Sequence, residues 1–165
     1  MPGEIAHHRD MGTKRGELRD LAAALTGITR RHQLRPGMVI VGLIELPDTI
    51  QHLLDTAVLA TADRAAADVR DCAARVRDVA ERLFGPRVVL GQPRHSFLTV
   101  VVRHGPLEFT ATDHRWIDGW LQADHGVPVL DAALVLMTEH GWRCADNRRR
   151  GYHPALAPYP SDLVS

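Results

Sequence analysis

The sequence predicts an α/β or α+β fold in which a helical N-terminal half packs on a small mixed sheet of about four strands. Two apolar stretches, 97–102 and 133–137, each have the length of a strand and each run into a His-Gly pair. An amphipathic stretch about one helix long separates them. This order is typical of a right-handed βαβ unit, which we expect near residues 96–139.

The beginning of the chain predicts a polar arm followed by a helix. Residues 1–15 mix charged and small polar side chains, and we interpret them as a flexible arm. Over 17–32, apolar residues recur at three- and four-residue steps: Leu18, Leu21, Leu25 and Ile28. This spacing places them on one face of a helix.

Residues 38–46 form a β-branched apolar run of strand length. We expect a buried strand there, with a helix as the alternative, because periodicity does not separate the two in a short apolar run. The apolar residues of 49–58 lie on one side of a helix, which Asp48 or Thr49 would cap.

Residues 62–84 give the clearest helical pattern in the chain. Seven small or apolar residues alternate four- and three-residue steps: Ala62, Ala65, Val69, Cys72, Val76, Val79 and Leu83. Opposite charges stand four residues apart on the other face, and each such pair stabilises a helix by only about 0.2–0.5 kcal/mol. We expect the apolar stripe to pack within its own domain. A dimer seam is the alternative, because three heptads reach the lower limit of a coiled coil.

The rest of the chain predicts strands around one further helix. The expected strands cover 87–90, 96–103 and 132–138, with a short edge extension at 106–110. Thr112 is the expected N-cap of the helix, and Gly126 its C-terminal cap. The helix should bury one apolar face, and Gly119 within it indicates a close packing contact. That face comprises Trp116, Ile117, Trp120 and Leu121.

These elements predict a single globular domain over residues 16–144. Residues 145–165 differ in composition, with three consecutive arginines followed by prolines and small residues. We interpret them as a tail that is poorly ordered or docks on a partner.

Composition excludes several classes of protein. Twenty basic residues balance twenty acidic ones, and aromatic residues make up 5% of the chain, so a nucleic-acid partner is not expected. No apolar run approaches the length of a membrane span or a signal-peptide core, so we expect a cytoplasmic protein without a membrane partner. Lys14 is the only lysine, which indicates the coding bias of a GC-rich bacterial genome. Cys72 and Cys144 lack CxxC spacing, and Cys72 is expected to be buried.

The two His-Gly pairs supply the candidate site. The carboxyl ends of parallel strands meet at one edge of a sheet, where open α/β sheets bind ligands. His104, His140 and Glu139 are the candidate catalytic residues, because imidazoles and carboxylates exchange protons near neutral pH. Arg103 and Arg143 are the candidate ligand-binding residues, because guanidinium groups bind phosphate and carboxylate in a bidentate manner.

The strand followed by Arg103-His104-Gly105 resembles the first motif of the histidine phosphatase superfamily. The strand followed by His140-Gly141 is similar to that superfamily's second histidine motif. The resemblance implies that His104 is a phosphorylated nucleophile, and that Arg103 and His140 bind the phosphate.

No metal site or cofactor is predicted. Six of the ten histidines follow residue 90, but none has the HxH, HxxxH or HExxH spacing of common metal ligands. A purely structural role also accounts for the His-Gly pairs, since a polar residue followed by glycine is a common end to a strand.

Two functional hypotheses follow from the sequence. The first is a small, non-enzymatic bacterial accessory or interaction protein that self-associates, as a homodimer, through helices within 17–84, or binds another protein. The alternative is a small hydrolase or phosphate-ligand-binding protein that uses His104 and His140 at the ends of two parallel strands.

Overall fold

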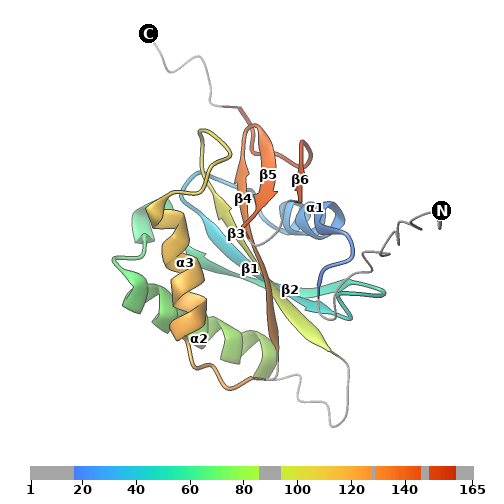
Figure 1. The fold of residues 1–165 in the computed structure, drawn as a ribbon, viewed down its shortest axis with the longest axis vertical. Coiled ribbons are helices and arrows are strands. Elements are labelled where there is room, and N and C mark those ends of the chain that lie inside the picture. The colour runs from blue at the N-terminus through green and yellow to red at the C-terminus, as the bar shows by residue number, and fades with distance from the viewer. Residues whose placement is uncertain (1–16, 86–93, 128, 146–148, 159–165) are drawn as a thin grey trace, which may run out of the picture.

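A computed structural model of the protein describes residues 17–85, 94–127, 129–145 and 149–158. Six strands of this part form one mixed sheet in the order β2-β1-β3-β4-β5-β6, and three helices pack on it (Figure 1). The predicted α/β or α+β class is confirmed, although six strands replace the expected four or so. In chain order the elements are α1 (Leu21–Arg31), β1 (Val39–Glu45), β2 (His52–Ala60), the 3₁₀ turn η1 (Ala62–Arg64), α2 (Val69–Phe84), β3 (His95–Val102), α3 (Ala111–Gln122), β4 (Leu130–Thr138), β5 (Gly141–Cys144) and β6 (Arg150–Gly151).

The predicted βαβ unit is the centre of the sheet. β3 and β4 are adjacent and parallel, with Val102 opposite Met137 near their carboxyl ends. All other neighbouring strands are antiparallel: β1 pairs with β2 and β3, β5 with β4, and β6 with β5. A parallel pair needs a crossover connection, and α3 provides it.

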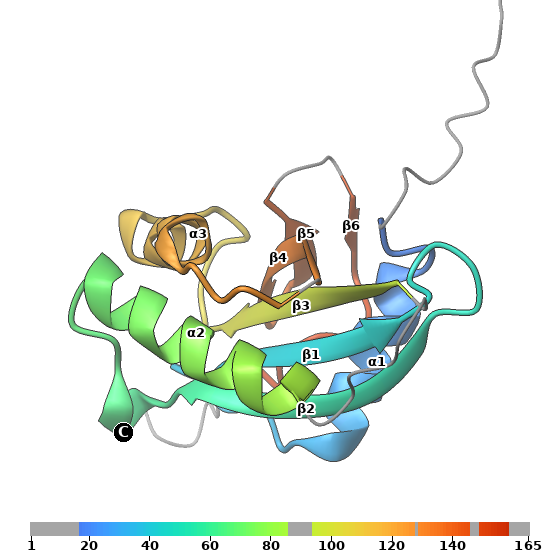
Figure 2. The same cartoon turned by 90° about the horizontal axis from the view of Figure 1, so that it is seen from below.

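Helices cover both faces of the sheet. In Figure 2, α2 and α3 lie on one face and α1 lies on the other. Successive residues of β1 alternate between the two layers: Val39, Val41 and Leu43 pack toward α2 and α3, whereas Ile40 and Ile44 pack toward α1. Because both faces are covered, β1 and β3 read as continuous apolar runs in the sequence.

The last described residues complete the layer on the α1 face. Leu156 is buried in the same cluster as α1, and its backbone N–H donates to the carbonyl of Thr138 at 3.0 Å. The indole Nε1 of Trp142 donates to the carbonyl of His153 at 2.9 Å. Arg149 donates to the carbonyl of Leu18 and forms an ion pair with Glu17 at 3.4 Å. Residues 149–156 therefore connect the C-terminal part of the described chain to the residues at its beginning.

The helix predicted over 49–58 is wrong, because this segment forms the edge strand β2. The spacing of its apolar residues is compatible with a helix, but hydrogen bonding to β1 makes it a strand. The paired register runs from Glu45 opposite His52 to Val39 opposite Ala60. A tight turn joins the two strands, with the N–H of Gln51 donating to the carbonyl of Leu46 at 2.8 Å. The N-terminal half is thus mixed, and its strand over 39–45 is confirmed.

Three predicted helices are present with different ends. α1 begins at Leu21, where Asp20 accepts a hydrogen bond from the N–H of Ala23. α2 begins only at Val69, capped by Asp68, because residues 62–64 form a separate 3₁₀ turn. The apolar stripe of α2 packs inside the chain, as expected, with the residues nearest the sheet and α3 buried: Cys72, Val76, Val79, Ala80, Leu83 and Phe84.

The N-cap of α3 is Thr110 rather than Thr112. Thr110 and Asp113 form a capping box, in which each side chain bonds the backbone N–H of the other residue. The helix ends at Gln122, so Gly126 lies beyond it and does not cap it. Trp116 and Trp120 are buried as predicted, but Leu121 is 80% exposed.

The remaining strand predictions have mixed outcomes. Residues 106–110 form a loop and not an edge extension. β4 covers the strand predicted over 132–138 but does not close the sheet, because β5 and β6 follow it. The strand predicted over 87–90 lies outside the described residues. Among the described residues, no helix has the length and apolar character needed to cross a membrane.

Gly119 marks the contact predicted for α3. A Cβ at this position would lie 2.7 Å from the Cβ of Cys72 and 3.2 Å from the backbone N of Ala73. α2 and α3 therefore pack with their backbones close together. Cys72 is buried as expected in the cluster beneath α2 and α3, and Cys144 is buried in the cluster on the opposite face, so the sheet separates the two thiols.

We expect Gly119→Ala to destabilise the protein by about 1–3 kcal/mol, because overpacking outweighs the higher helix propensity of alanine. Urea unfolding followed by circular dichroism measures the change. Asp118→Ala, at an exposed position of the same helix, is the control and should stay within about 0.5 kcal/mol of the wild type. Equal stability of the two variants would contradict the close contact.

Candidate functional site

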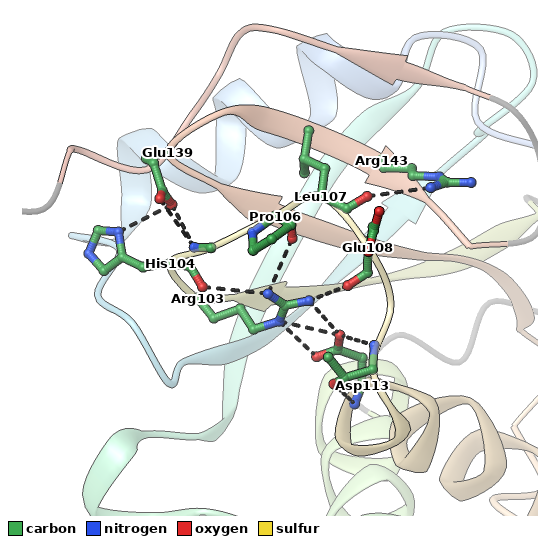
Figure 3. A network of polar contacts seen from close by, with 10 residues as sticks. Arg103, His104, Pro106, Leu107, Glu108, Asp113, Glu139 and Arg143 are labelled. Atoms are coloured by element: carbon green, nitrogen blue, oxygen red, sulfur yellow. Dashed lines mark hydrogen bonds and ion pairs between the residues drawn. The ribbon is translucent and has the colours of Figure 1, made fainter.

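The carboxyl ends of β3 and β4 bring three of the five predicted site residues together. β3 runs into Arg103-His104-Gly105, and β4 runs into the two-residue turn Glu139-His140 before β5. Because the strands are parallel neighbours, these segments lie side by side (Figure 3). His104, Glu139 and His140 meet there, as the sequence predicted.

Glu139 is the centre of this group. Its carboxylate lies 3.3 Å from Nδ1 of His104 and 3.5 Å from Nε2 of His140. It also accepts hydrogen bonds from the backbone N–H of Gly105, at 3.0 and 3.2 Å. A carboxylate can only accept, so a hydrogen bond at this contact comes from a proton on Nδ1 of His104. Glu139 thus ties the loop after β3 to the turn after β4.

Two glycines make these turns possible. Gly105 has a φ of +116° and Gly141 a φ of +120°, values that residues with a Cβ rarely adopt. A Cβ on Gly141 would also lie 2.1 Å from the carbonyl oxygen of Gly151 on β6. The backbone conformation at the second position of each His-Gly pair therefore explains why that residue is glycine.

The surroundings of Glu139 favour its ionised form. Burial, the largest single influence, raises its pKa. Hydrogen bonds from its own N–H, from Gly105 and from His104, with the nearby His140, together outweigh burial and lower the pKa below its usual value. Glu139 and His104 have side chains 20% exposed, whereas His140 is 64% exposed. Only His140 is thus widely open to solvent.

Arg103 does not face this group. Its guanidinium forms an ion pair with Asp113 at 3.0 Å and donates to the carbonyls of Pro106 and Glu108 (Figure 3). The Asp113 side chain is only 3% exposed and belongs to the capping box of α3. Arg103 therefore has a structural role, since removing it would leave a buried carboxylate without its counter-charge, and its binding of a ligand stays a prediction.

Arg143 is not part of the group either. It lies on β5, is exposed, and donates to the carbonyl of Leu107 at 3.4 Å, away from His104 in Figure 3. The two predicted arginines therefore do not converge on His104 and His140. No pattern in the sequence pairs Arg103 with Asp113, because the bend that joins them depends on the irregular loop between β3 and α3.

The described residues also contain no group of three or more histidine, cysteine, aspartate or glutamate side chains placed to hold a metal ion. Glu139 with its two histidines can share and relay protons, and it can fasten two loops.

Comparison with protein-family models, curated proteins and solved structures found no match to this chain. The resemblance of Arg103-His104-Gly105 to the histidine phosphatase motif therefore rests on those residues alone.

Glu139→Gln should cost about 1–2 kcal/mol of unfolding free energy at neutral pH, because charge-assisted hydrogen bonds are lost. The lowered pKa means that the carboxylate stabilises the fold above the ordinary carboxyl pKa. This contribution disappears as the pH falls through the lower folded-state value. The gap between variant and wild type should thus close in acid. Urea unfolding across this pH range measures it, with the exposed Glu108→Gln as control, and a gap independent of pH would exclude the proposed role.

Arg103→Met should destabilise the protein by about 3–5 kcal/mol, because the buried Asp113 loses its partner. Arg143→Met is the matched control and should change stability by no more than about 0.5 kcal/mol. Thermal and urea unfolding compare the two. Similar small effects would show that Arg103 is not a structural residue.

Proposed function

We propose that the protein is a non-enzymatic interaction protein that self-associates as a two-fold symmetric dimer through the charged side of α2. The observation that supports it is the order of charges along this helix. Asp71, Arg75, Asp78 and Arg82 follow one another with alternating sign, at steps of four, three and four residues. This spacing places all four on one face.

The face borders a groove that suits a second chain. The groove has a volume of about 680 Å³ and runs between α2 and the second half of β2. Its strand side is mainly apolar, with Val58, Leu59 and Ala60, and its helix side carries the four charged residues. Arg64 of η1 also lines the groove. Val58 is 38% exposed in the single chain. Such a groove combines an apolar floor with a charged rim, as many protein interfaces do.

The charge order is complementary to itself. When two copies of α2 lie antiparallel across a two-fold axis, Asp71 faces Arg82 of the second copy, and Arg75 faces its Asp78. Symmetry repeats both pairs, so four pairs of opposite charge form and no like charges meet. Asp78 and Arg82 pair with each other at 3.4 Å, and their side chains are 71% and 63% exposed, so a partner can also reach them. Asp71 and Arg75 pair at 3.0 Å and are 32% and 26% exposed, so they add charge to the face rather than new hydrogen bonds. Charge complementarity of this kind selects the partner and its orientation.

Arginine side chains occupy two carbonyls along the neighbouring strand edge. Arg31 donates to the carbonyl of Leu53 at 2.9 Å, and Arg75 donates to that of Leu59 at 3.1 Å. Side chains that occupy edge carbonyls prevent another strand from adding to the sheet. The contact we propose therefore uses side chains of α2 and of the groove, and not strand addition.

This dimer interface differs from the coiled-coil seam that the apolar stripe of 62–84 offered as an alternative in the sequence. The apolar stripe of α2 is buried against α3 and the sheet within one chain. The charged side of the same helix is the one available to a partner.

A hydrolase is a second candidate, favoured by the contact of His104 and His140 with the same carboxylate. Its weakness is that Arg103 is bonded to Asp113 and to backbone carbonyls. Turnover of a simple phosphate monoester by the purified protein, and its loss in His104→Asn, would distinguish this candidate from the interaction protein.

A polarity swap tests the dimer. The double variant Asp78→Arg, Arg82→Asp keeps the net charge and the ion pair within the helix, but it makes all four pairs between chains repulsive. We expect the wild type to sediment as a dimer at about 100 μM and the variant as a monomer. High salt should also dissociate the wild type, because exposed charges are screened.

The control is the swap Arg77→Glu, Glu81→Arg, on exposed positions of the same helix that do not line the groove. It should remain dimeric. A monomeric wild type, or dimers of both variants, would overturn the proposal. Circular dichroism verifies that each variant folds.

A further inference from the structure

A cavity of about 170 Å³ lies beside the carboxyl end of β3, separate from the groove on α2 although Ala60 borders both. Its walls come from the turn before β1, the end of β2, the end of β3 and the first turns of α2 and α3. Most of the lining is apolar. The apolar lining residues include Met38, Val39, Ala65, Ala66, Val101 and Trp116.

Three charged residues line the cavity, and two of them are bonded to each other. Arg103 and Asp113 form the buried ion pair described above. The third, Arg115, is half-buried on α3, and no hydrogen bond or ion pair joins it to the rest of the described chain. A guanidinium on an apolar cavity without an acceptor is the cation that an anionic ligand would require.

The size of the cavity limits the apolar part of a ligand. An apolar cavity of about 150 Å³ holds one benzene ring. A phosphate would gain little from apolar walls, and the fork of Arg103 is occupied. A single carboxylate on a small apolar body fits both the walls and the one available guanidinium.

The one thiol in the cavity lining is a poor nucleophile. Cys72 lines it, and burial, with a further contribution from Asp71, raises the pKa of its thiol to about 11. The thiol thus stays protonated at neutral pH and contributes an apolar surface instead of a nucleophile.

We propose that this cavity is a binding site for a small monocarboxylate with an apolar body about the size of one aromatic ring, whose carboxylate pairs with Arg115. The site is independent of the dimer, so either proposal can fail without the other.

Benzoate is the probe, and titration of the wild-type protein followed by backbone amide shifts and by the indole N–H shift of Trp116 measures its binding. Benzamide has the same shape without the charge, and Arg115→Met removes the cation. We expect each change to weaken binding by about tenfold or more, since one charge-assisted contact is lost. Arg143→Met, an exposed arginine outside the cavity, should bind benzoate as the wild type does.

Three results would overturn the proposal. They are no binding of benzoate up to about 10 mM, equal binding of benzoate and benzamide, or unchanged binding by a folded Arg115→Met variant. Shifts confined to residues away from the cavity would overturn it as well.

Discussion

The parallel pairing of β3 with β4 is the constraint on which the rest of the structure depends. Two parallel neighbours cannot be joined by a tight turn, so the chain must leave the sheet and return, and α3 is that connection. α3 then buries Trp116 and Trp120 against the sheet and approaches α2 so closely that residue 119 has no side chain. In this way one strand pair determines the layer of helices that covers it.

Polar residues at the ends of these strands hold loops in place. Glu139, in the turn after β4, accepts hydrogen bonds from Gly105 in the loop after β3. Arg103 donates to carbonyls of its own loop and forms an ion pair with the buried Asp113. An arginine engaged in this manner cannot turn to a substrate without leaving a carboxylate uncompensated in the interior. The Arg-His-Gly triplet therefore resembles a catalytic motif, while its arginine has a structural role in this fold.

Elements with a strong pattern could be predicted from the sequence, and elements decided by distant partners could not. The strands after residues 38 and 96 and the three helices have apolar runs or periodic stripes, so local sequence was enough. The segment 49–58 has helical spacing, but it becomes β2 because β1 needs a neighbour on its open side. The meeting of His104, Glu139 and His140 followed from the parallel strands, whereas the Arg103–Asp113 pair depends on loop geometry that has no periodic signature.

The contacts of residues 149–156 have a consequence for how the chain folds. Leu156 and Arg149 close the layer that begins with Leu18 and α1, more than a hundred residues earlier. During synthesis, α1 and the strands beneath it emerge before this late segment, so the cluster on this face is completed only when Leu156 joins it. Contacts between such distant segments slow folding and expose apolar surface to aggregation in the meantime.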